Sequence, residues 1–365
     1  MNAFLILEDG TVYEGRHIGF QKEVISEIVF NTSMTGYQEV LTDPSYAGQA
    51  VVMTYPLIGN YGVNGEDMES AKAWPDGYVV RELSRNYSNF RAEGSIEDFL
   101  IENEIPGVCG IDTRALTKRL RDKGTMNGMI TTQMPADMDE ALSRIKAYTT
   151  GDVVSKVTCS EKRVVPPAEG TQGLPGYGKK VALLDLGEKR NITRCLTALG
   201  CEVTEWPAGT GAQDILGSSP DGIMLSNGPG DPKECTSIIE EIRKLYESDV
   251  PIFAICLGHQ LMALAAGADT HKMKYGHRGG NHPVKDLISG KVYISSQNHG
   301  YVVDTDNLDE NVAVPAFVNV NDGTNEGLRY VNRKIFTVQF HPEASPGPRD
   351  AGDLFDKFIG MMSED

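Results

Sequence analysis

The sequence lacks any long apolar run, and this absence excludes a membrane-spanning helix. No uninterrupted apolar stretch approaches the roughly 20 residues that such a helix needs. At the start, Met1–Asp9 holds a short apolar stretch with no basic residue before it, so we expect no signal peptide. Basic residues are also scarce: 34 Lys and Arg stand against 51 Asp and Glu, for a net charge of −17. An acidic surface repels nucleic acid and anionic lipid, so we expect neither nucleic acid nor a membrane as a partner.

Cysteine is sparse, and no two cysteines form a C-x-x-C pair. We therefore expect reduced thiols and a cytoplasmic protein rather than a disulfide framework. Structural zinc sites usually show two tight ligand pairs. The available ligands are irregularly spaced, so we expect no metal site: Cys256, His259, His271, His277 and His282. The sequence also has no G-x-x-x-x-G-K-[ST] loop, so we expect no cofactor of the nucleotide type in this chain.

A stretch rich in Gly and Pro divides the chain. Seven of the nineteen residues from Lys162 to Lys180 are Gly or Pro, which cannot hold a long helix or a central strand. At about 100–200 residues per domain, 365 residues suffice for two domains. We expect an N-terminal domain at 1–161, a linker at 162–178 and a C-terminal domain at 179–365.

The two halves differ in the order of their expected elements. Before the linker we expect a small mixed α/β domain, with strands at 3–7, 11–13, 24–31 and 49–55 and helices at 96–104 and 112–123. After it, apolar strands alternate with helices, which indicates a mostly parallel sheet flanked by helices on both faces. The expected strands there are 181–186, 203–206, 222–225, 251–255 and 334–340, with helices ending near 199, 246 and 266.

Cys256 lies at the corner where the apolar strand 251–255 meets a helix. This is the geometry of a nucleophile elbow, in which a reactive side chain stands at the carboxyl end of a strand. The positive end of the helix favours a thiolate, and its free N–H groups, Leu257 first, can hold an oxyanion. Gly258 leaves room for a substrate near the backbone. The alternative is a buried core thiol, the common state of a free cysteine.

A thiol nucleophile needs a base, and His341 is the preferred candidate. It follows the strong strand 334–340, so it should lie at the same edge of the sheet, and Glu343 is near enough to orient its ring. His259 is the rival base because it is close to Cys256 in sequence, although a packing role suits it better. The alternatives are a loop histidine at 341 and a solvated acid at 343.

Three separated motifs resemble those of the class I glutamine amidotransferases: LSNGPGDP at 225–232, FAICLGHQ at 253–260 and HPE at 341–343. Further stretches resemble the small subunit of carbamoyl-phosphate synthetases: FNTSMTGYQEVLTDPSY at 30–46, GHRGGNHPV at 276–284 and SQNHGY at 296–301. The resemblance covers the whole chain. Because class I domains in other enzymes lack this N-terminal domain, it points to that family.

The resemblance implies a role for each matching residue. Cys256 would attack the glutamine carboxamide, His341 would protonate the departing ammonia and then activate water, and Glu343 would orient His341. N–H groups of Leu257 and Gly228 would hold the oxyanion. The other positions implied to shape or line the glutamine site are Gly230, Gln260, Asn298, Gly300, Tyr301 and, from the N-terminal domain, Ser45.

Two residues depart from the family pattern. Ala254 stands where Gly is frequent, and Tyr301 stands where Phe is frequent. A Cβ costs little on an extended backbone, and the backbone of Tyr301, the expected contact, is unchanged. Neither departure alters the implied activity.

The resemblance also implies a partner. The ammonia would pass to a separate large subunit, in a heterodimer or a higher oligomer, where ATP and Mg²⁺ would drive carbamoyl phosphate synthesis for arginine and pyrimidine production. L-glutamine would be the substrate of this chain. Two other functions stay open: an amidotransferase that serves another acceptor, and a regulatory subunit with an inactive site.

Overall fold

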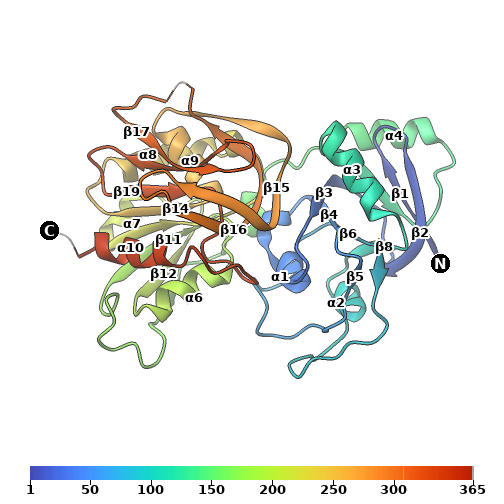
Figure 1. The fold of residues 1–365 in the computed structure, drawn as a ribbon, viewed down its shortest axis with the longest axis horizontal. Helices are drawn as coiled ribbons and strands as arrows, with labels where there is room; N and C mark the ends of the chain where they lie inside the picture. The colour runs from blue at the N-terminus through green and yellow to red at the C-terminus, as the bar shows by residue number, and fades with distance from the viewer. Residues whose placement is uncertain (307, 364–365) are drawn as a thin grey trace. The chain divides into compact units, whose positions relative to one another are not determined.

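The computed structural model describes residues 1–306 and 308–363, which form two compact units, Met1–Gly151 and Asp152–Asp365 (Figure 1). The division therefore differs from the expected linker at 162–178. That segment lies inside the second unit, where β10 (Arg163–Val165) pairs antiparallel with β12 (Glu202–Pro207). Two β-branched valines suit a short edge strand, and Pro166 ends it because proline cannot donate to a ladder.

The first unit is built on a closed barrel with the strand order β1-β2-β8-β6-β4-β3-β9. The expected strands at 3–7 and 11–13 are confirmed, because β1 and β2 pair antiparallel on either side of the turn Glu8–Gly10. Closure was not evident from the sequence, since it depends on pairing of β1 with the distant β9. The strands are β1 (Asn2–Leu7), β2 (Val12–Gly19), β3 (Val24–Asn31), β4 (Gln49–Met53), β6 (Gly77–Val80), β8 (Pro106–Cys109) and β9 (Met126–Thr131), with a separate pair β5 (Leu57–Ile58) and β7 (Glu82–Leu83).

Three helices in the first unit, α2, α3 and α4, begin at side-chain caps. Ser95 accepts from the Asp98 N–H at the start of α2, and Asp112 accepts from the Ala115 N–H at the start of α3. The expected helices 96–104 and 112–123 are therefore confirmed, the first ending slightly earlier. The helices are α1 (Tyr37–Thr42), α2 (Ile96–Glu102), α3 (Thr113–Lys123) and α4 (Met138–Lys146), with the 3₁₀ turn η1 (Pro44–Tyr46).

The second unit contains a ten-stranded sheet with the order β10-β12-β11-β13-β14-β19-β18-β17-β15-β16. Its five strands from β12 to β19 are parallel, which confirms the expected mostly parallel centre. The strands not yet given are β11 (Lys180–Asp185), β13 (Gly222–Leu225), β14 (Ile252–Ile255), β15 (Asp269–Asp286), β16 (Val292–Asp304), β17 (Ala313–Asn319), β18 (Asn325–Tyr330) and β19 (Ile335–Val338).

Helices cover both faces of this parallel centre, and each face has its own core. Alternate residues of β11 separate them, with Leu184 packed in one core and Leu183 in the other. The first core includes residues of α7 (Ala212–Gly217), α8 (Thr236–Tyr246) and α9 (Leu257–Ala265). The second includes residues of α6 (Arg190–Ala198) and α10 (Asp353–Met361). Two short elements complete the unit: α5 (Val154–Val157) and η2 (Pro232–Glu234).

All six cysteines are free. Within 1–306 and 308–363, no helix is both long and apolar enough to span a membrane.

Candidate active site

Cys256 stands between the end of β14 and the first residue of α9. Its backbone has φ 54° and ψ −106°, a conformation that residues with a side chain rarely adopt. Such strain costs on the order of 1–3 kcal/mol and persists only where the surroundings enforce it. Here a hydrogen bond from the Cys256 N–H to the Val338 carbonyl, 2.8 Å long, ties the turn to β19. The side chain is buried, with 3% of the residue exposed.

Gly258 lets the helix start close to the neighbouring strand. A Cβ at this position would lie 2.5 Å from the Leu225 carbonyl oxygen at the end of β13. The Gly258 N–H donates to the Ser226 carbonyl at 3.0 Å. The glycine is therefore required by close backbone packing, which fixes where α9 begins and where Cys256 points.

His341 and Glu343 follow β19, the strand that pairs with β14. His341 is 2% exposed, and its Nδ1 lies 2.6 Å from Oε1 of the equally buried Glu343. The His341 N–H also donates to the Ser296 carbonyl at 2.9 Å. The structure thus places Cys256, His341 and Glu343, the predicted nucleophile, base and orienting acid, at the ends of two adjacent parallel strands.

Neighbouring charged groups shift the pKa values of His341 and Glu343. Burial alone lowers the pKa of His341, but the Glu343 carboxylate and hydrogen bonding to Cys256 and Glu343 outweigh burial and raise it to about 10. Burial would likewise raise the pKa of Glu343, but Lys189 and His341 bring it down to about 2. The imidazolium and the carboxylate are therefore the favoured forms at neutral pH. The Nε2 atom of His341 makes no hydrogen bond of normal geometry within the described residues, and Cys256 is among the groups that act on the ring. Nε2 can therefore exchange a proton with a substrate at Cys256.

Lys189 belongs to the site, although the sequence analysis did not identify it. It caps α6 just after β11, and its buried ammonium lies 3.2 Å from Glu343 Oε1 and donates to the Ala344 carbonyl at 2.6 Å. Its backbone N–H donates to Asn227 Oδ1 at 3.0 Å. Lys189 follows the carboxyl end of a parallel strand, and ligand sites form at such strand ends. This position could have marked Lys189 as a candidate in the sequence.

The expected oxyanion loop follows β13. Gly228 is tightly enclosed: a Cβ there would lie 2.2 Å from the Leu186 carbonyl and 2.8 Å from the Leu257 side chain. The two residues predicted to donate N–H groups therefore lie next to each other. Gly230 has φ +94°, which favours glycine, and turns the loop against Val153.

The segment 298–301 of β16 lies against the nucleophile. The Asn298 carbonyl is 3.7 Å from Cys256 Sγ. Gln260, on α9, donates from Nε2 to the Tyr301 carbonyl at 2.9 Å and to Gln339 Oε1 at 2.9 Å. Gly300 has little free space beside it, since a Cβ would lie 3.2 Å from the Arg278 guanidinium. Four residues of the expected glutamine pocket thus gather around α9 and β16.

Two other expectations concern residues around this centre. His259 is fully buried, its Nδ1 lies 2.7 Å from Thr337 Oγ1, and burial lowers its pKa to about 3, so the ring packs as a neutral group. Ser45 belongs to the first unit, in η1, where its N–H donates to Asp43 Oδ1 at 2.9 Å. Its contact with glutamine stays a prediction.

One group within the described residues has the donor atoms to hold a metal ion: His277, His299 and Glu326, with ligand atoms within 4.8 Å of one another. Only His277 was among the ligands weighed from the sequence. The Gln297 amide, however, already hydrogen-bonds both His299 Nε2 and Glu326 Oε1. The ring nitrogens of the two histidines and Oε1 of Glu326 thus all lie close to other protein groups.

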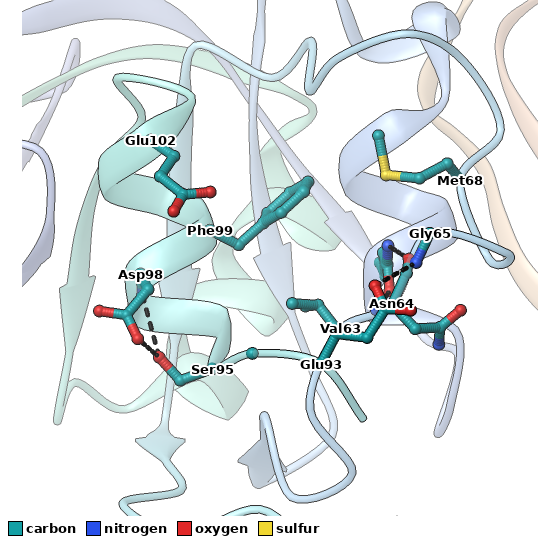
Figure 2. A pocket seen from close by; sticks show the side chains of 11 residues that line it. Val63, Asn64, Gly65, Met68, Glu93, Ser95, Asp98, Phe99 and Glu102 are labelled. Carbon is teal, nitrogen blue, oxygen red and sulfur yellow. Dashed lines mark hydrogen bonds between the residues drawn. The ribbon is translucent and has the colours of Figure 1, made fainter. Parts of the chain in front are cut away.

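A separate cavity of about 280 Å³ lies in the first unit, between α2 and the loop around Asn64 (Figure 2). No cysteine, histidine, lysine or arginine lines it. Its walls are Gln38, Val63, Asn64, Gly65, Met68, Glu93, Gly94, Ser95, Asp98, Phe99 and Glu102. Without a cysteine or a histidine, this cavity does not carry the thiol chemistry proposed for the Cys256 centre.

Comparison with known proteins assigns both halves of the chain. Residues 5–130 match the model of the carbamoyl-phosphate synthase small chain CPSase domain, and residues 182–361 match class-I glutamine amidotransferase. The carbamoyl phosphate synthase small chain of Clostridium perfringens is 50% identical over 98% of this chain and 99% of its own. That of Bacillus caldolyticus is 49% identical over 100% and 97%. The chain belongs to the carbamoyl phosphate synthase small chain family.

Among solved structures, a putative GMP synthase subunit from Thermoplasma acidophilum aligns with a TM-score of 0.46 and 25% identity, over 51% of this chain and 94% of its own. The Cys256 centre falls inside the amidotransferase match, whereas Ser45 falls inside the CPSase-domain match.

Proposed function

We propose that this chain is the glutamine-hydrolysing subunit of a carbamoyl phosphate synthase. The observation that carries the proposal is the buried group of Cys256, His341 and Glu343 at the ends of β14 and β19, in a chain of this family. The elbow at Cys256, the raised pKa of His341 and the Gly228 loop support thiol chemistry on an amide carbonyl.

The proposed reaction has two displacements. The Cys256 thiolate attacks the glutamine carboxamide, and N–H groups of Leu257 and Gly228 hold the oxyanion. The His341 imidazolium gives its proton to the leaving nitrogen as the C–N bond breaks, which releases ammonia and leaves a thioester. Neutral His341 then takes a proton from water as the water oxygen attacks the thioester. The C–S bond breaks, which releases glutamate and restores the Cys256 thiolate beside the His341 imidazolium.

Each pocket residue has a defined role in this proposal. Asn298, Gly300 and Tyr301 present the backbone of β16 to glutamine, and Gln260 holds that backbone through the Tyr301 carbonyl. Gly230 shapes the oxyanion loop, and Ser45 contacts glutamine from the first unit. Glu343, itself held by Lys189, keeps His341 in place.

The partner in this proposal is a large subunit that takes up the ammonia. We assign ATP, Mg²⁺ and the synthesis of carbamoyl phosphate to that subunit, with this chain needing no cofactor of its own. The match of residues 5–130 to the small-chain CPSase domain favours this acceptor over any other served by amidotransferase domains. The intact Cys256, His341 and Glu343 argue against a regulatory subunit with an inactive site.

The test is release of glutamate from glutamine by this chain, first alone and then in the presence of a large subunit. We expect release with the partner present and its loss in Cys256→Ala. A wild-type complex that forms but releases no glutamate would contradict the proposal. Co-purification with a synthetase of another class would support the alternative acceptor.

A further inference from the structure

A buried polar cluster lies beside the pocket segment 298–301 and has no role in the proposed mechanism. It joins strands β15, β16 and β18 through His277, Gln297, His299 and Glu326, all buried. Such a network in a core restricts the packing around it, because each unpaired group would cost free energy.

Glu326 is the anionic centre of the cluster and is 0% exposed. Its Oε1 accepts from Gln297 Nε2 and from Asn319 Nδ2, both at 2.9 Å, and lies 3.4 Å from His277 Nδ1. Its Oε2 makes no hydrogen bond within the described residues. A buried carboxylate is costly unless it is hydrogen-bonded, and the amides of Gln297 and Asn319 supply these bonds to Glu326.

The Gln297 amide connects Glu326 to His299. Because its Nε2 donates to Glu326, its Oε1 points the other way and lies 2.7 Å from His299 Nε2. The other ring nitrogen of His299 lies 2.8 Å from the Tyr301 carbonyl. Both partners of the ring are oxygen acceptors, and burial lowers the pKa of His299, so the neutral imidazole carries one N–H. The ring therefore donates to one of these oxygens and only contacts the other, and Glu326 sets the direction of the amide on one side.

The Tyr301 carbonyl connects the cluster to the pocket. It accepts from Gln260 on α9 and contacts the His299 ring, so side chains lie against it from two directions. Three residues earlier in the same strand, the Asn298 carbonyl lies 3.7 Å from Cys256 Sγ. A change at Glu326 can thus move the backbone that faces the thiol without touching the thiol.

We propose that Glu326 is a positioning residue for glutamine: through Gln297 and His299 it fixes the backbone of 298–301 in the shape that binds the substrate. This inference rests on the proposed glutaminase function and adds to it a residue that does not touch the substrate. What Glu326 supplies is a hydrogen-bond acceptor for the Gln297 amide. Because this acceptor affects the binding of glutamine rather than bond breaking, its removal raises KM and leaves kcat unchanged.

The experiment measures KM and kcat for glutamine in the complex with a large subunit, using Glu326→Leu, Glu326→Gln and Gln297→Met. Glu326→Leu removes the acceptor at similar volume, Glu326→Gln keeps one oxygen acceptor, and Gln297→Met removes the connecting amide. The matched control is Asp322→Asn, which alters the exposed partner of His277 but leaves the path from Glu326 to Tyr301 intact.

We expect Glu326→Leu and Gln297→Met to raise KM by about tenfold or more with kcat within about twofold. Glu326→Gln and Asp322→Asn should stay within about threefold of the wild type. Synthesis from added ammonia, measured on the same samples, reports that each variant folds and assembles. If Glu326→Leu does not assemble, Gln297→Met decides the question with the same expected KM.

Three outcomes would overturn the inference: an unchanged KM in both Glu326→Leu and Gln297→Met, a fall in kcat at constant KM, or stoichiometric zinc bound to the purified wild type through His277, His299 and Glu326. A wild type that releases no glutamate would instead refute the glutaminase proposal, so the two failures are distinguishable.

Discussion

The ammonium of Lys189 lies 3.2 Å from the same Glu343 oxygen that His341 Nδ1 approaches at 2.6 Å. One carboxylate oxygen is thus shared by a buried lysine and the candidate base. Since Lys189 also donates to the Ala344 carbonyl, it holds both the side chain and the following backbone of the acid. The triad is therefore a group of four, built from the ends of β11, β14 and β19.

Replacing Cys256 by Ala should abolish glutamine-dependent carbamoyl phosphate synthesis while leaving synthesis from added ammonia. The physical reason is that the proposed mechanism uses the Cys256 thiolate to release ammonia from glutamine, whereas added ammonia bypasses this step. The two activities are measured on one preparation of the complex. Cys235→Ala, at a partly buried thiol on the face of the first core, is the matched control and should keep both activities.

Replacing Glu343 by Gln should move the alkaline limb of the kcat/KM profile to lower pH. Glu343 is the leading charge that raises the pKa of His341 to about 10, so its neutralisation lowers that pKa and the imidazolium is lost earlier as pH rises. The measurement is glutaminase rate against pH for both proteins. An alkaline limb that stays in place would show that Glu343 does not set the charge of His341.

Replacing Lys189 by Met should lower kcat about 10- to 100-fold, part of the about 10²–10⁴ that acid–base catalysis supplies. Without the ammonium, burial raises the pKa of Glu343 and weakens its hold on His341. Lys233→Met removes an exposed lysine paired with Asp269 and should keep the wild-type rate. Equal rates for Lys189→Met and Lys233→Met would show that Lys189 has no role in catalysis.

Replacing Gly258 by Ala should destabilise the second unit by about 1–3 kcal/mol and reduce glutaminase activity, because the new Cβ meets the Leu225 carbonyl and displaces α9. Gly217→Ala is the control: it ends a helix, and its added Cβ meets no atom within 4 Å. Thermal unfolding of the two variants, followed by the rate of each, tests the difference. A Gly258→Ala protein as stable and active as the control would contradict the close-packing argument.

Much of the fold could be predicted because its signals are local. Strands such as 222–225 and 252–255 consist of apolar residues, so their burial could be predicted from their own sequence. The caps Ser95 and Asp112 mark helix starts. Closure of the barrel could not be predicted, because β1 meets β9 across more than a hundred residues of chain. The edge strand β10 was missed because its three residues lie beside a Pro-rich stretch typical of a linker.

In the candidate site, too, only the residues with a local signal could be predicted from the sequence. Cys256 and His341 each follow a strong strand, so their place at the sheet's edge was predictable from neighbouring residues. Lys189 was not, because Gly-Glu-Lys after β11 resembles any charged turn until Glu343 is placed beside it. The Glu326 network was also beyond the sequence, since its members come from separate antiparallel strands whose register shifts at irregular positions.

The placement of β19 between β14 and β18 has a consequence for biogenesis. A growing polypeptide contains Cys256 well before the ribosome has made β19, yet His341 and Glu343 arrive only with that strand. Until β19 inserts into the middle of the sheet, the thiol has no partner to activate it, and the turn at Cys256 lacks its bond to Val338. In the proposed mechanism, a chain that ends before β19 therefore lacks the base for Cys256, and it hydrolyses no glutamine until this strand has folded.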